Sequence, residues 1–161
     1  MEKDYYAYDA LKILIEISKN AQEAFLEEVH HMGEIDYIKE FCTVRLATAR
    51  RGGHTEAAFK LIEEDGMNIG YFCLNNTMAN IFKNRYRQIK KNTNFGNLEF
   101  SSSIKNLENN IFGKDLSNLD AIVFDNSFMM SKKLQNNIYS YLSSSLFYNR
   151  GRRPFFFIFL Q

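Results

Sequence analysis

Two arginines and two glycines form a turn whose chemistry suits phosphate. Arg50, Arg51, Gly52 and Gly53 follow an apolar run and precede a predicted helix that begins at about Thr55. Guanidinium groups pair well with phosphate oxygens, so the turn could supply charge to an anion. A turn of this composition also occurs as a plain tight connection between a strand and a helix. The residues alone leave both interpretations open.

A second group of cations lies in another predicted helix. Five cations fall within nine residues, with Tyr86 among them: Lys83, Arg85, Arg87, Lys90 and Lys91. On a helix they spread over more than one face, so a solvated surface is one interpretation and contact with a nucleic-acid phosphate backbone is the other. Arg150, Arg152 and Arg153 form a further cationic turn, for which a solvated loop and a binding role are equally open.

Side chains that commonly bind metals or act as nucleophiles are few. His30 and His31 are adjacent, and adjacent helical residues diverge by about 100°, so they cannot face one metal; we expect them to act as cations at a helix C-terminus. Cys42 and Cys73 each lie in an apolar run. Two thiols without clustered histidines are too few for a structural zinc site, so both are predicted to be buried and reduced. No order of serine, histidine and aspartate indicates a nucleophilic enzyme.

Alternating strands and helices must position these groups. Periodicity of three to four residues predicts a first helix from about Asp9, its cap, to Met32, ended by Gly33. Ser101 to Ser103 are expected to form a turn. The remaining predicted elements are strands at Phe41–Ala49, Ile69–Leu74, Leu98–Ser101, Ala121–Phe124 and Pro154–Leu160, and helices at Thr55–Glu64, Thr77–Lys91 and Ser131–Leu146.

This order predicts the fold class. Repeated strand, turn and helix units indicate parallel strands joined by crossover helices. We therefore expect an α/β fold with a mainly parallel sheet, flanking helices and an added N-terminal helix. At 161 residues the chain fits a single domain, 1–161, with a helical extension at 1–40 and a core at 41–161.

Composition and charge narrow the class of protein. The chain is 45% hydrophobic and 24% charged, which is typical of a globular protein, and no apolar run approaches the roughly 20 residues of a bilayer span. We expect a soluble, cytoplasmic protein with no membrane partner. Residues 2–40 carry ten acidic and four basic side chains, so the rest of the chain is basic and could meet a polyanion. One proline, no tryptophan and many Asn, Lys and Ile residues suggest an AT-rich, viral genome and a host-cytoplasmic location.

The order of these segments resembles a known family. From Phe41 to Gln161 the chain looks like the first RecA-like domain of P-loop NTPases, especially helicases and the large terminases of tailed phages. In that family a strand runs into G-x-x-x-x-G-K-[ST], whose backbone N–H groups and helix N-terminus hold phosphates. Gly53 and Thr55 match the end of the motif, whereas His54 occupies the lysine position and Thr48 the first glycine position.

Three later segments extend the resemblance. Tyr71–Asn80 is similar to the second strand and the turn that contacts nucleic acid in helicases, and Pro154–Gln161 to a further core strand. Leu119–Asn126 resembles the Walker B strand, whose aspartate holds the metal and whose following glutamate activates water. The resemblance implies ATP with Mg²⁺ at Thr55 and Asp125. It also implies a phosphate site formed by Arg50, Arg51, Gly52, Gly53, His54 and Thr55.

The departures from the family decide the expected chemistry. Histidine is shorter than lysine and carries less positive charge near pH 7, so phosphate binding should be weaker. Asn126 stands where the glutamate belongs, so the attacking water has no evident base and Asp125 is catalytic only if the chain is active. We expect a phage-encoded, degenerate P-loop protein that binds nucleic acid or a protein machine, with little or no hydrolysis. The alternatives are an active packaging or helicase ATPase, and a viral inhibitor of a host complex.

Overall fold

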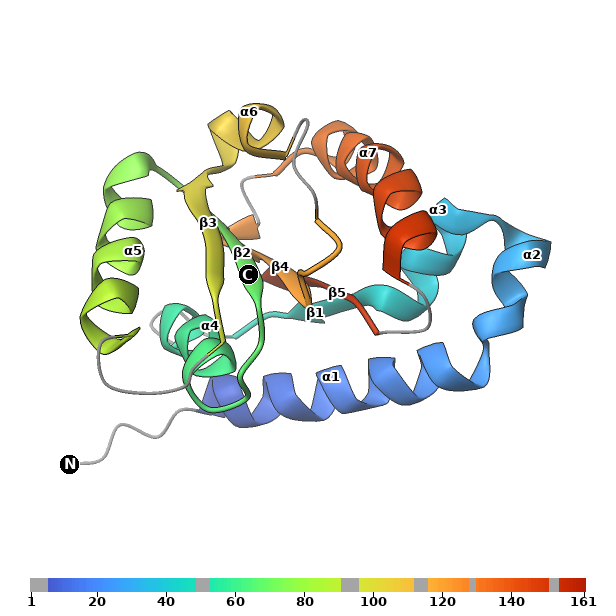
Figure 1. Cartoon of the computed structure of the whole chain (residues 1–161), viewed down its shortest axis with the longest axis horizontal. Coiled ribbons are helices and arrows are strands. Elements are labelled where there is room, and N and C mark those ends of the chain that lie inside the picture. Colours follow the sequence, from blue (N-terminus) through green and yellow to red (C-terminus); the bar gives the residue numbers. More distant parts are fainter. Residues whose placement is uncertain (1–5, 49–52, 91–95, 112–115, 128–129, 151–153) are drawn as a thin grey trace.

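Five parallel strands form one sheet at the centre of the molecule (Figure 1). The computed structural model describes residues 6–48, 53–90, 96–111, 116–127, 130–150 and 154–161. The strand order is β1-β5-β4-β2-β3, and all four pairings are parallel. The strands are β1 (Thr43–Leu46), β2 (Ile69–Cys73), β3 (Leu98–Ser103), β4 (Ala121–Asp125) and β5 (Phe156–Leu160). The predicted α/β class with a parallel sheet is confirmed.

Helices cover both faces of this sheet. One face packs against α1 (Tyr6–Ala24), α4 (His54–Glu63) and α5 (Asn76–Lys90). The other packs against α2 (Val29–Met32), α3 (Glu34–Tyr37), α6 (Leu107–Ile111) and α7 (Lys132–Arg150). Figure 1 shows α1 and α4 on one side and α6 and α7 on the other. None of the helices in the described ranges combines the length and apolar character needed to cross a bilayer.

The two covers explain why β5 is apolar at every position. Side chains alternate across a strand, so Phe156, Ile158 and Leu160 enter one core, whereas Phe157 and Phe159 enter the other. A strand of a parallel sheet with both faces covered has no solvent side and reads as a continuous hydrophobic run. The predicted central position of this strand is confirmed, since β5 lies between β1 and β4.

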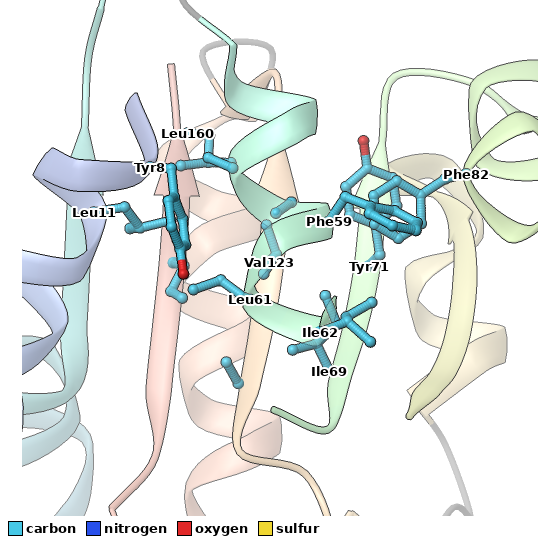
Figure 2. Packing of buried hydrophobic residues seen from close by; sticks show 14 of the residues in the cluster. Tyr8, Leu11, Phe59, Leu61, Ile62, Ile69, Tyr71, Phe82, Val123 and Leu160 are labelled. Atoms are coloured by element: carbon cyan, nitrogen blue, oxygen red, sulfur yellow. The ribbon is translucent and has the colours of Figure 1, made fainter. Parts of the chain in front are cut away.

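A buried amide connects α1 to the chain just before β5. Gln22, only 7% exposed, donates from Nε2 to the Phe155 carbonyl oxygen at 2.8 Å, and its Oε1 accepts from the Phe155 N–H at 3.1 Å. The amide therefore satisfies both backbone groups of a buried residue. The N-terminal helix also contributes Tyr8 and Leu11 to the core between α4 and the sheet (Figure 2).

The predicted single helix from Asp9 to Met32 is wrong in its continuity. The helix α1 ends at Ala24, a 3-10 turn spans Leu26–Glu28, and α2 ends before Gly33, whose φ of 85° suits its predicted role as a stop. The Phe25 ring stacks on Phe41 at 5.2 Å, and this contact accompanies the change of direction. Asp9 lies within the first turns of α1 rather than at its cap.

Two strand boundaries also differ from the prediction. Ile38–Cys42 forms a π-helical turn, so the strand predicted from Phe41 begins at Thr43, whose hydroxyl donates to the Ile38 carbonyl at 3.0 Å. The strand position predicted for Cys42 is therefore wrong, although both cysteines are buried and free as expected. Ser101–Ser103 belong to β3 and not to a turn, because they pair with the last three residues of β2. The Ser101 hydroxyl also donates to the Ala79 carbonyl of α5.

Candidate phosphate-binding site

Of the turn predicted to bind phosphate, the structure describes Gly53 and the first residues of α4. Gly53 caps the helix with φ 83° and ψ 27°, a left-handed conformation that glycine adopts without steric cost. Its carbonyl accepts the Ala57 N–H at 2.8 Å and so begins the helix. The glycine that matches the family motif therefore has a local reason to be glycine. Arg50, Arg51 and Gly52 lie outside the described residues.

His54, at the lysine position, contacts the end of the preceding strand. Its Nε2 lies 2.7 Å from the Thr48 hydroxyl, which belongs to the segment just after β1. The Thr48 N–H in turn donates to the Gln161 carbonyl at 3.3 Å. The two residues close the base of the turn. In this arrangement the imidazole is engaged within the protein instead of extending over a ligand, as a lysine would.

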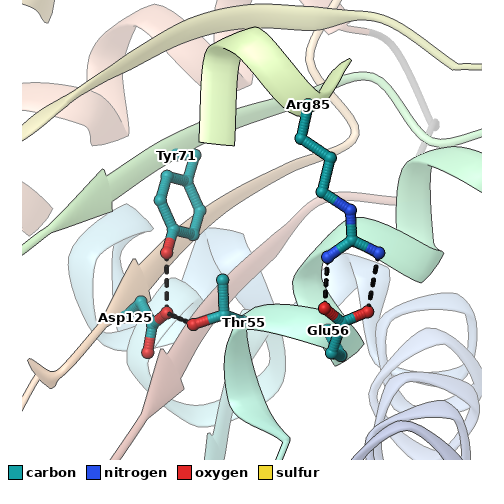
Figure 3. A network of polar contacts seen from close by, with 5 residues as sticks. All are labelled: Thr55, Glu56, Tyr71, Arg85 and Asp125. Carbon is teal, nitrogen blue, oxygen red and sulfur yellow. Dashed lines mark hydrogen bonds and ion pairs between the residues drawn. The ribbon is translucent and has the colours of Figure 1, made fainter. Parts of the chain in front are cut away.

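Asp125 brings the two motifs together at the carboxyl ends of the strands (Figure 3). Its Oδ2 accepts the Thr55 hydroxyl at 2.7 Å and the Tyr71 hydroxyl at 2.6 Å, and its Oδ1 accepts the Asn126 N–H at 3.0 Å. The carboxylate is 2% exposed. Thr55 and Asp125, 70 residues apart in sequence, are in direct contact.

The topology explains why these groups meet where they do. The chain leaves β4 toward β5 and leaves β2 toward β3, so the two neighbouring strands send it in opposite directions. In open α/β sheets, ligands bind in the crevice outside the carboxyl ends of the strands at such a switch point. Asp125 ends β4 at this place, and Tyr71 comes from β2 beside it.

Tyr71 is fixed in position and remains protonated. It has no exposed surface, and its ring stacks on Phe82 with centroids 3.8 Å apart and planes 8° from parallel (Figure 2). Burial, followed by the nearby Asp125 carboxylate, raises the pKa of the Tyr71 phenol well above its ordinary value. The hydroxyl is therefore a permanent donor to Asp125.

The surroundings of Asp125 do not fit a magnesium ion bound directly to its carboxylate. Thr55 and Asp125 offer the oxygen atoms that Mg²⁺ prefers. The lone pairs of Oδ2, however, accept two hydroxyls, and the carboxylate is enclosed. Within the described ranges, no three His, Cys, Asp or Glu side chains lie close enough to form a metal site.

Asn126 adopts a backbone conformation that suits asparagine better than glutamate. Its φ is 59°, and it is the non-glycine residue with positive φ in the described part of the chain. Asparagine and aspartate enter this region at lower cost than other side chains because their short polar groups bond locally. Asparagine at position 126 is thus matched to its turn.

The cations of α5 do not act as one group. Arg85 makes a two-point ion pair with Glu56 of α4, including Nη2 to Oε2 at 2.7 Å (Figure 3). Its guanidinium lies 4.1 Å from the Phe59 ring centroid. Lys83 and Arg87 line a hollow of about 300 Å³ between α5 and β3. The Lys90 ammonium lies 3.3 Å from the Asn97 amide oxygen.

Some of the predicted cations lie outside the described residues, and one residue of the site was not predicted. Lys91, Arg152 and Arg153 lie outside them, and Arg150 ends α7. Tyr71 was not singled out, although a tyrosine in an apolar strand requires a buried partner for its hydroxyl, and that requirement is the signal that could have found it.

Comparisons with protein-family models, curated proteins and solved structures give no match. Function is therefore inferred from the arrangement of the side chains described above.

Proposed function

We propose that the chain is a degenerate P-loop NTPase-like protein that binds nucleotide phosphate at the turn before α4 with little or no hydrolysis, and acts on nucleic acid or a protein machine. The observation that supports this proposal is the 2.7 Å hydrogen bond between Thr55 and Asp125. It joins the residue that matches the end of the phosphate-binding motif to the aspartate of the Walker B-like strand. A plain strand-to-helix connection requires no such pairing.

The surroundings of the turn favour binding over hydrolysis. Phosphoryl transfer depends on charge neutralisation and on a positioned water. His54 is engaged by Thr48, and Asn126 supplies no carboxylate. Glu56, the residue after Thr55, is paired with Arg85 and therefore does not serve as a ready base.

Nucleotide binding and turnover test this proposal together. A fluorescent ATP analogue should bind the wild-type chain and bind Thr55→Val more weakly, because that variant lacks the hydroxyl bonded to Asp125. Thr77→Val changes an exposed threonine on α5 and serves as the matched control. Steady-state ATP hydrolysis should equal background. Turnover on the order of 1 s⁻¹ that Asp125→Ala abolishes would instead support the active packaging or helicase ATPase.

Contact with nucleic acid, the first of the two modes of action proposed above, is favoured by the two cations, Lys83 and Arg87, that share a hollow with Glu99. Neutralised phosphates release counterions, so affinity for unrelated oligonucleotides should fall steeply with salt. Replacing Lys83 and Arg87 together by alanine should make the salt slope shallower by roughly one unit per lost contact. Arg85→Ala is the control, because Arg85 is paired with Glu56 and should leave the slope unchanged. Absence of binding at low salt would favour a protein partner, as in the inhibitor hypothesis.

A further inference from the structure

We propose that Tyr71 takes the place of a divalent cation at Asp125, so that the site accepts phosphate groups without Mg²⁺. The inference rests on the proposed function and specifies the form of nucleotide that the site would take. It begins with the acceptor capacity of one oxygen atom.

The oxygen Oδ2 of Asp125 has no capacity left for a metal. A carboxylate oxygen offers two lone-pair sites. The Thr55 hydroxyl at 2.7 Å and the Tyr71 hydroxyl at 2.6 Å occupy both of them. The other oxygen accepts the Asn126 N–H and is enclosed with the rest of this 2% exposed residue. A direct bond from Asp125 to Mg²⁺, at about 2.0–2.1 Å in near-octahedral geometry, would need a free and accessible lone pair on this carboxylate.

Tyr71 cannot move aside to admit a cation. Its ring stacks on Phe82, and Phe82 packs edge-on against Phe59 of α4 with centroids 5.6 Å apart. The backbone of Tyr71 lies in β2, which pairs with β3 on one side and β4 on the other. Rotation of the phenol would leave a void in a closely packed core and an unpaired buried hydroxyl.

The hydroxyls of Thr55 and Tyr71 stabilise the negative charge of Asp125, as a cation would otherwise do. Two charge-assisted hydrogen bonds satisfy the buried carboxylate, so no metal is needed to compensate its charge. Phosphate oxygens would then meet the N–H groups at the start of α4 without a cation between them and Asp125. Free nucleotide should bind at least as well as its magnesium complex.

The test compares ATP binding in EDTA with binding in excess Mg²⁺, for wild type, Tyr71→Phe and Tyr8→Phe. Wild type should bind equally in both conditions. Tyr71→Phe frees a lone pair on Asp125, so the affinity of this variant should shift in favour of the magnesium complex over free ATP. Tyr8 is a matched control, because its hydroxyl also donates to an aspartate, Asp65, which lies just after the C-terminal end of α4. Tyr8→Phe should behave as wild type.

Each outcome is informative even if one variant fails to fold. Wild-type binding that requires Mg²⁺ overturns the inference and leaves the proposed function standing. If no form binds ATP, the proposed function fails, and Mn²⁺ alone, followed by its EPR signal, still tests the site. More bound Mn²⁺ in Tyr71→Phe than in wild type supports the inference, whereas equal binding by both overturns it. If Tyr71→Phe does not fold, the wild-type comparison of EDTA with Mg²⁺ decides.

Discussion

Placing glutamate at position 126 should weaken the fold without creating an ATPase. Asn126 has φ 59°, and the left-handed region costs an ordinary L-residue roughly 1–2 kcal/mol. Asparagine bears only part of this cost, so Asn126→Glu should lower the free energy of unfolding by about 1 kcal/mol. The hydrogen bond to the Asp125 carboxylate comes from the backbone of residue 126 and should survive. ATP turnover should stay at background, because His54 still occupies the lysine position.

Urea unfolding followed by circular dichroism measures the loss of free energy, and thermal unfolding measures the change in Tm. In a chain of this size a loss of 1 kcal/mol lowers the Tm by roughly 2–4 °C. Asn126→Gly is the control for the backbone, since glycine enters the left-handed region freely and should keep stability near wild type. Asn126→Asp adds a carboxylate at little backbone cost. A glutamate variant as stable as wild type, together with a destabilised glycine variant, would refute the reasoning, as would any gain of turnover.

Two further predictions concern buried groups away from the turn. Gln22→Ala removes the partners of both Phe155 backbone groups and should cost about 2 kcal/mol in urea unfolding, whereas Asn20→Ala, exposed on the same helix, should cost little. Burial raises the pKa of the Cys73 thiol to about 11. Burial is also the main reason that the pKa of the Tyr37 phenol is raised to about 12. The unfolded chain releases these protons first, so stability should fall as the pH rises from about 9 through 11; unchanged unfolding midpoints between pH 8 and 11 would contradict this.

The parts of the fold that could be predicted are those that local pattern determines. The strands at Ile69, Ala121 and Phe156 are apolar because both faces of the sheet are covered, and α4 and α5 have clear apolar stripes. The break after Ala24 and the π-helical turn before Thr43 could not be predicted. They depend on contacts such as the stacking of Phe25 on Phe41, which exist only after distant segments have met.

The candidate site likewise has residues that the sequence could indicate and contacts that it could not. Gly53, Thr55 and Asp125 were expected from the resemblance, because the motif residues have a fixed order along the chain. The pairing of Arg85 with Glu56 spans 29 residues and two helices, and no local pattern predicts it. It means that a cluster of charges in sequence is not a cluster of available charges on the surface.

The place of β5 in the sheet has a consequence for the order of folding. Thr43 of β1 pairs with Phe157, more than a hundred residues later, and β5 separates β1 from β4. During synthesis β2, β3 and β4 can associate while β1 still lacks its neighbour, and such long-range pairings form slowly. The Thr48 N–H can form its hydrogen bond to the Gln161 carbonyl only after that residue has been synthesised. The contact between Thr48 and Gln161 should therefore be among the last to form, so a nascent chain halted before residue 156 would contain three of the five strands and lack this contact.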